Sequence, residues 1–261
     1  MRTTDMADEL VRGPETELPA GVRLATAKRG GVTVTRVEIA REGLARPRGR
    51  YVTLEMPSVS VLDERDTDVI ETGAAELRAL LPPEGPVLVL GIGNRRVTAD
   101  ALGPRTAQKI LVTMGPQHTL PVRGIRPVAA LAPGVSGDTG LTLRQLAAAM
   151  VDAVRPTALI CVDSLCSAEA ARLGRTIQFS DIGLHPADAR HARHLDAAAL
   201  GVPVIAAGIP TLMDADEGAD LVLTPRALDS VIAHGSALLA GILNRALQPR
   251  LSVAQLCWLT G

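Results

Sequence analysis

The stretch that decides the fold is Pro86-Val-Leu-Val-Leu-Gly-Ile-Gly-Asn-Arg-Arg-Val-Thr-Ala-Asp-Ala-Leu-Gly-Pro104. It begins with a run of branched apolar residues that ends at Gly91, a pattern typical of a short strand buried on both faces. Two glycines then permit a sharp turn, and a proline stands in the first turn of the helix that follows. Asp100 precedes this helix. We therefore expect its carboxylate at the carboxyl edge of a central parallel strand, where open α/β sheets place their sites.

The glycines of this stretch do not form a phosphate-binding loop. Arg96 stands where the dinucleotide fingerprint requires its third glycine, and no Gly-Lys-Ser or Gly-Lys-Thr follows. The chain also lacks a Gly-x-Ser-x-Gly elbow, and Cys166 has no histidine close to it in the sequence. Nucleotide binding through these loops and a serine or cysteine hydrolase are therefore not expected.

Composition limits the functions that remain. The chain has 261 residues, of which 47% are hydrophobic and 21% charged, as in a soluble domain with a sizeable core. A net charge of −1 and single Phe, Tyr and Trp residues argue against binding to nucleic acid or to a membrane surface. Three cysteines without a zinc-like spacing fit a reduced cytoplasmic compartment. We find no signal peptide and no apolar run long enough to span a membrane.

The chain divides into an arm and one domain. Residues 1–28 lack a periodic apolar pattern, which predicts an extended or disordered N-terminal arm. Residues 29–261 are predicted to form a single α/β domain that begins with an antiparallel edge ribbon at 29–57. The ribbon would consist of the alternating strands Val32–Ile39 and Gly49–Pro57.

Strands and helices alternate from Pro86 onward, which predicts a three-layer α/β/α fold of the phosphorylase/hydrolase-like kind with a mostly parallel central sheet. A helix is also expected before this region, at Asp66–Leu81. The later strands are predicted at Val87–Leu90, Pro127–Leu131, Ala158–Val162, Thr176–Phe179 and Val202–Ala207, and the helices at Gly103–Val112, Leu141–Val154 and Pro225–Leu247.

Two aspartates are the candidates for catalysis. Asp163 directly follows the buried run Ala158–Val162, so its carboxylate is expected at the same sheet edge as that of Asp100. Both residues could instead cap helices. As a site, two close carboxylates could share a proton and serve as general acid and base. Alternatively they could bind a divalent metal together with His185.

The remaining candidates lie in loops. Gly134, in Ala132-Pro-Gly134-Val-Ser-Gly137, could present backbone amides to a substrate or oxyanion, or belong to a plain crossover loop. Asn94 belongs to the Gly-x-Gly-Asn turn. Asp181 could support the site or fix a turn. His191 and His194 have the spacing of a metal-binding pair, although a solvated surface is the simpler interpretation.

These motifs resemble the germination protease family, whose members degrade small acid-soluble spore proteins. The resemblance rests on Gly91-Ile-Gly-Asn94 followed by Thr98-Ala-Asp100-Ala-Leu-Gly103-Pro. It is more remote to the hydrogenase-maturation proteases, which have a similar turn. Further matching strings are Gly49-Arg-Tyr-Val-Thr-Leu-Glu55, Arg126-Pro-Val, Ala132-Pro-Gly134, Thr176-Ile-Gln, Gly183-Leu-His-Pro186, Leu200-Gly-Val-Pro-Val-Ile205 and Gly208-Ile-Pro-Thr211.

The resemblance implies an atypical aspartic endopeptidase that needs no metal or other cofactor, with Asp100 and Asp163 as its two essential acids. It also implies a zymogen that processes itself. Thr4-Asp5-Met6-Ala7-Asp8-Glu9 is similar to the family's processing site, which suggests a cut between Asp5 and Met6. Such proteases form homotetramers in the cytoplasm of the spore core. The hydrogenase-maturation relatives would instead imply nickel, or zinc, held by Asp100, Asp163 and His185.

The chain departs from the family pattern at three places. Thr113-Met114-Gly115 replaces a family Thr-Arg-His, and the loop after Pro186 lacks a Gly-Ser-Gly and basic run. A long insertion usual between Asp214 and Thr224 is absent. Two alternatives therefore stay open beside the spore endopeptidase. One is a metal-dependent maturation-type peptidase of the same fold, and the other is a descendant that binds spore proteins without cutting them.

Overall fold

The computed structural model describes residues 4–10, 18–44, 46–115, 124–185, 194–215 and 221–260. The strands are β1 (Val22–Arg29), β2 (Val32–Ile39), β3 (Gly49–Glu55), β4 (Val87–Gly91), β5 (Val128–Leu131), β6 (Ala158–Cys166), β7 (Thr176–Ser180), β8 (Val204–Asp214) and β9 (Val222–Leu223). The helices are α1 (Thr67–Leu80), α2 (Leu102–Ala107), α3 (Ser136–Thr139), α4 (Leu143–Val154), α5 (Ala197–Leu200), α6 (Leu228–Leu247) and α7 (Val253–Thr260). Three 3₁₀ turns are η1 (Val59–Val61), η2 (Thr98–Asp100) and η3 (Ala170–Arg172).

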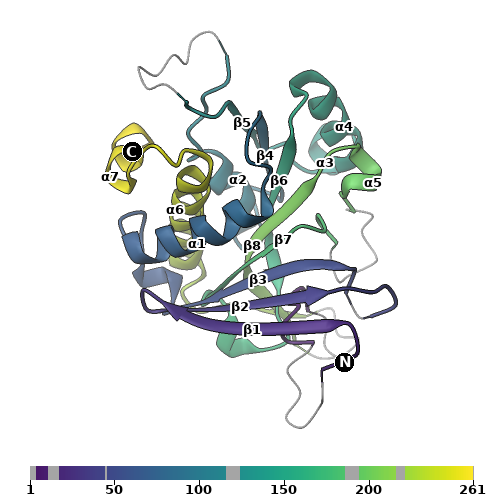
Figure 1. Cartoon of the computed structure of the whole chain (residues 1–261), viewed down its shortest axis with the longest axis vertical. Coiled ribbons are helices and arrows are strands. Elements are labelled where there is room, and N and C mark those ends of the chain that lie inside the picture. Colours follow the sequence, from purple (N-terminus) through teal and green to yellow (C-terminus); the bar gives the residue numbers. More distant parts are fainter. Residues whose placement is uncertain are drawn as a thin grey trace.

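One mixed sheet organises the fold. Its strand order is β1-β2-β3-β7-β8-β6-β4-β5, and β9 pairs with the end of β8 (Figure 1). The four strands from β8 to β5 are mutually parallel, whereas β1, β2, β3 and β7 join them through antiparallel pairs. The predicted class, a mostly parallel central sheet with an antiparallel edge ribbon, is confirmed.

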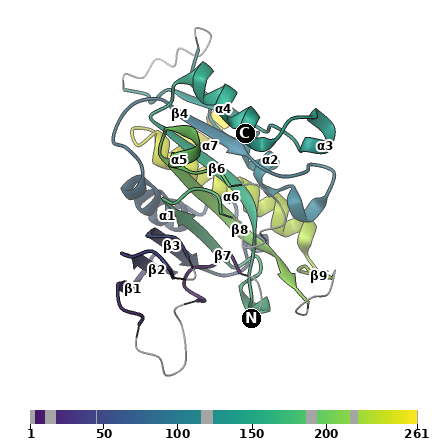
Figure 2. The ribbon, with the colours of Figure 1, turned by 90° about the vertical axis from the view of Figure 1, so that its right-hand side faces the viewer.

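Alternating side chains of the central strands build the two outer layers. Val87 and Val89 of β4 belong to an apolar cluster that includes residues of α1, α2 and α6. Leu88 and Leu90 point to the opposite face, where α4 and α5 cover them. Because successive residues of a strand face opposite sides, one buried strand requires helices on both faces. Figures 1 and 2 show these helices on either side of the sheet.

α6 is the central helix of its layer. Its length and mean hydropathy would allow it to cross a membrane, but 72% of its apolar stretch of 18 residues is buried inside the protein. Its buried side chains pack against α1, α2 and η1. A buried core helix can be as apolar as a membrane-spanning helix, because burial selects the same apolar residues as lipid does.

Two strands extend further than the sequence predicts, and this changes the position of Asp163. β6 and β8 remain paired from Leu159↔Val204 to Cys166↔Leu212. Asp163 is therefore the sixth residue of a nine-residue strand, opposite Gly208, and not the last residue before a helix. Pairing between β6 and β8 keeps the residues after Asp163 extended, although their own sequence pattern predicts that the strand ends there.

The N-terminal arm also differs from the prediction. Its last part forms β1, which pairs antiparallel with β2 along its whole length. The connecting residues Gly30 and Gly31 both have positive φ angles, 52° and 76°, as two-residue hairpin turns require. The Gly-Gly pair between two alternating segments is the signal that could have revealed this hairpin. The predicted boundary near residue 28 thus falls inside a strand.

Gly103 allows α2 to pack against the sheet, and we expect Gly103→Ala to destabilise the protein by about 3 kcal/mol. A Cβ there would lie 2.2 Å from the carbonyl oxygen of Ile92 and 2.3 Å from that of Val162, and backbone atoms cannot rotate away. Gly137→Ala in α3 is the control, because a Cβ there meets nothing within 4 Å. Urea unfolding of both variants tests this; equal midpoints would contradict it.

Candidate active site

Asp100 lies where the sequence places it, after the glycine turn that follows β4. Its Oδ2 accepts a hydrogen bond from the backbone N–H of Asn94 at 2.7 Å, which anchors the carboxylate to the turn. Gly93 has a φ of 122°, and a Cβ there would be 2.0 Å from the Asp100 carbonyl oxygen. Thr211 of β8 donates its hydroxyl to the Ala99 carbonyl at 2.9 Å, which holds η2 against the sheet. Glycine and threonine thus position the acid.

Asp163 projects from β6 on the face that also carries Leu159 and Cys161, the face covered by α4 and α5. It is only 6% exposed, and its Oδ1 accepts the Ser164 N–H at 2.8 Å. β4 and β6 are adjacent parallel strands, as expected. The N–H of Ile92 donates to the Val162 carbonyl at 2.8 Å, and η2 contacts both β6 and β8. The two candidate acids therefore belong to adjoining segments at one end of the sheet.

A cavity beside Asp163 leaves about 50 Å³ of water-accessible space, enough for at least one water molecule. It combines sheet residues with the 182–185 loop and, unexpectedly, with the N-terminal segment. Asp163 and His185 contribute to its wall, whereas Asp100 is not among the described residues that line it. The lining residues are Asp5, Arg46, Tyr51, Asp163, Ser164, Leu165, Gln178, Ser180, Ile182, Gly183, Leu184, His185 and Ala206.

The segment Thr4–Leu10, which contains the predicted processing site, is docked at this cavity. The N–H of Asp5 donates to the Cys166 carbonyl at 2.8 Å, and the Cys166 N–H donates to Asp5 Oδ2 at 2.8 Å. Arg46 contacts Asp5 Oδ1 at 3.3 Å and donates to the Thr4 carbonyl at 2.9 Å. Met6 is completely buried. Asp5 therefore binds to the end of the same strand that carries Asp163.

Gln178 of β7 brackets the peptide bond between Asp5 and Met6. Its Nε2 donates to the Asp5 carbonyl oxygen at 2.8 Å, and its Oε1 accepts the N–H of Ala7 at 2.8 Å. The partners fix the orientation of the amide, because a carbonyl requires a donor and an N–H requires an acceptor. One side chain thus holds the backbone on both sides of the predicted cut.

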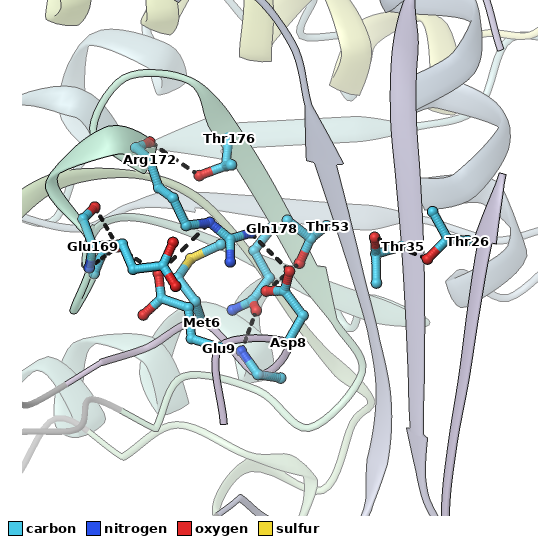
Figure 3. A network of polar contacts seen from close by, with 12 residues as sticks. Met6, Asp8, Glu9, Thr26, Thr35, Thr53, Glu169, Arg172, Thr176 and Gln178 are labelled. Atoms are coloured by element: carbon cyan, nitrogen blue, oxygen red, sulfur yellow. Dashed lines mark hydrogen bonds and ion pairs between the residues drawn. The ribbon is translucent and has the colours of Figure 1, made fainter. Parts of the chain in front are cut away.

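The next two residues, Asp8 and Glu9, enter a buried polar network with Arg172 (Figure 3). Arg172 donates to Asp8 Oδ2 at 2.8 Å, and its Nε lies 3.6 Å from Glu9 Oε1. Sequence reasoning missed Arg46, Arg172 and Gln178. Gln178 ends the matching string Thr176-Ile-Gln, but no local pattern assigns a role to any of the three residues, because each role depends on a partner more than forty positions away.

His185 does not join the two acids in a metal-binding group. Its Nε2 lies 3.0 Å from the Ile182 carbonyl and 3.5 Å from Asp196 Oδ2. Burial, followed by the neighbouring His194, lowers the pKa of His185. In the part of the chain that the structure describes, no three His, Cys, Asp or Glu side chains assemble into a possible metal site. Asp163 and His185 line the same cavity, but Asp100 is not among the described residues of its wall.

The other candidates have structural contacts. Asp181 accepts the Arg50 N–H and pairs with its guanidinium, both at 2.7 Å, on the rim of the sheet. Gly134 adopts a φ of 80° in the loop before α3 and is not among the described residues that line the cavity. Burial and the nearby Asp214 and Asp5 raise the pKa of the Cys166 thiol to about 12, so it is no ready nucleophile. His191 lies outside the described residues.

The sequence profile of one family, described as germination protease, matches residues 3–217 of this chain. The chain belongs to the germination protease family. The germination protease of Clostridium perfringens (strain SM101 / Type A) is 32% identical to it over 278 residues, covering 84% of this chain and 86% of the relative. The germination protease of Caldanaerobacter subterraneus subsp. tengcongensis is 39% identical over 216 residues, covering 77% and 65%.

Membership of the germination proteases confirms the resemblance drawn from the motifs, and it makes this chain a peptidase of the spore-germination type. Among solved structures, the hydrogenase maturation protease HycI of Thermococcus kodakarensis KOD1 matches with a TM-score of 0.43 and 16% identity. This match covers 66% of this chain and 98% of HycI. Nothing about the chemistry of the germination protease site follows from it.

Proposed function

We propose that this protein is an endopeptidase that degrades small acid-soluble spore proteins during germination and is made as a self-processing zymogen. One observation carries the proposal: the Asp5–Met6 bond of the processing-site segment is held by Gln178 at the cavity that contains Asp163. An inhibitory segment that resembles the substrate would occupy the substrate's place. Removal of residues 1–5 by a cut at this bond is the first step toward the active enzyme.

The chemistry is assigned to Asp100 and Asp163 as general acid and base. One carboxylate removes a proton from water, whose oxygen adds to the carbonyl carbon of Asp5. Gln178 Nε2 donates to the carbonyl oxygen as negative charge develops on it. The carbon–nitrogen bond then breaks, and the protonated acid supplies the proton that the leaving amine of Met6 requires.

Three further parts of the proposal rest on family resemblance and composition. The enzyme acts as a homotetramer in the cytoplasm of the spore core, and it binds neither nucleic acid nor membranes. It requires no metal or other cofactor. A metal-dependent peptidase of the same fold stays the alternative that a chelator tests directly.

Incubation of the purified chain with a small acid-soluble spore protein tests the substrate and the metal together. We expect cleavage after an acidic residue, at the same rate in the presence and absence of chelator. Mass spectrometry of the products identifies the cleaved bond. The control substrate carries the amide in place of that acidic residue and is cut slowly. Loss of cleavage with chelator would replace the two-carboxylate mechanism by a metal-dependent one. An intact substrate after removal of residues 1–5 would overturn the substrate assignment.

A further inference from the structure

Arg172 is a buried cation whose charge is balanced by the N-terminal segment. The residue is 5% exposed, and it follows β6 in the turn η3. Its two ion-pair partners among the described residues are Asp8, at 2.8 Å, and Glu9, at 3.6 Å. Both carboxylates are themselves almost completely buried, with side-chain exposures of 0% and 3%. Figure 3 shows both acids beside the Arg172 guanidinium.

Each carboxylate also meets neutral donors from the body of the protein. Thr53 of β3 donates its hydroxyl to Asp8 Oδ1 at 3.2 Å. The hydroxyl of Ser167 donates to Glu9 Oε1, and the Ala168 N–H donates to Glu9 Oε2 at 2.9 Å. The body therefore presents two preformed carboxylate-binding positions that share Arg172. Sites of this kind discriminate strongly, because a neutral side chain leaves buried donors and a buried charge unpaired.

The positions of these sites relative to the cut define what they select. Met6 and Ala7 are the first and second residues after the bond held by Gln178, so Asp8 and Glu9 are the third and fourth. Residues 6–10 stay attached to the mature chain after the cut, so Asp8 and Glu9 must undock from Arg172 before a substrate chain can supply new carboxylate partners. We infer that Arg172 is the specificity residue that selects acidic side chains at the third and fourth positions after the scissile bond, an inference that rests on the proposed function.

Peptide cleavage by the full chain tests this inference. The probe is the peptide with the sequence of residues 1–12, compared with peptides that carry Asp8→Asn, Glu9→Gln or both. We expect wild type to cleave the acidic peptide at least about 30-fold faster, in kcat/KM, than the doubly neutral one, as for a buried charge pair. In Arg172→Gln this preference should fall to about threefold or less, while Arg172→Lys keeps part of it because the charge is retained.

Arg245→Gln is the matched control, because Arg245 is also largely buried, at 17% exposure, and pairs with Glu71 at 2.7 Å far from the segment. It should retain the full preference for the acidic peptide. An unchanged preference in Arg172→Gln would overturn the inference. So would an equal loss in both arginine variants, because the effect would then reflect general destabilisation.

A second readout separates this inference from the proposed function. In the full chain with Asp163→Asn, amide hydrogen exchange at Ala7 reports docking of the segment without any cleavage. We expect Arg172→Gln to accelerate this exchange by about 30-fold, and Arg245→Gln to leave it unchanged. Should no peptide be cleaved by any variant, faster exchange in Arg172→Gln would still support the role of Arg172. Unchanged exchange would refute it.

Discussion

Replacing Asp163 by asparagine is expected to leave the chain folded and to slow removal of residues 1–5 by about 10³-fold or more. Asparagine keeps the oxygen that accepts the Ser164 N–H at 2.8 Å, so the side chain retains its anchor in β6. An amide cannot take up or release the proton that hydrolysis requires. Asp100→Asn should slow processing by a factor of the same order. The contact with the Asn94 N–H is preserved in this variant as well, and the acid is removed.

The measurement is the mass of the purified chain over time, with intact and processed forms resolved at the Asp5–Met6 bond. Asp138→Asn is the matched control, because Asp138 pairs with Arg96 at 3.3 Å on an exposed surface and should process at the wild-type rate. Far-UV circular dichroism and the urea midpoint establish that each variant folds. Processing of Asp163→Asn at the wild-type rate would remove this residue from the mechanism.

The part of the site that follows from the sequence is the part made by contiguous residues. A buried run, two glycines and an acid within fifteen positions place Asp100 at a strand end, because each step has a local physical cause. β4 and β6 then meet as neighbours in the observed sheet. The fold class follows for the same reason, since alternation of strands and helices leaves few topologies.

What the sequence does not reveal depends on pairing across the chain. β6 extends past Asp163 because β8 pairs with it. The residues after Asp163 show no apolar alternation that would predict a strand from the sequence alone. In the sequence, nothing distinguishes Arg172 from the other arginines. Its role becomes visible only in the structure, where Asp8, 164 positions away, lies against it. The processing segment could be recognised as a motif, but its burial against β6 and β7 results from contacts with residues more than 150 positions later.

Gln178→Glu is expected to slow self-processing by about 10²- to 10³-fold, the effect of removing one donor from an oxyanion. Glutamate has nearly the shape of glutamine and retains an oxygen for the Ala7 N–H, which lies 2.8 Å away. It loses the Nε2 donor to the Asp5 carbonyl and places a negative oxygen where charge develops in the transition state. The rate should therefore fall more than docking of the segment does.

Comparison of rate with docking decides what Gln178 does. Amide exchange at Ala7 measures docking, and the appearance of the processed mass measures the rate. Gln145→Glu is the control, because that residue caps α4 through its Oε1 and glutamate caps equally well. If amide exchange at Ala7 rises by the same factor as the rate of processing falls, Gln178 only binds the segment. If exchange changes little while the rate falls, Gln178 acts in the transition state, and the Asp5 carbonyl is the group that water attacks.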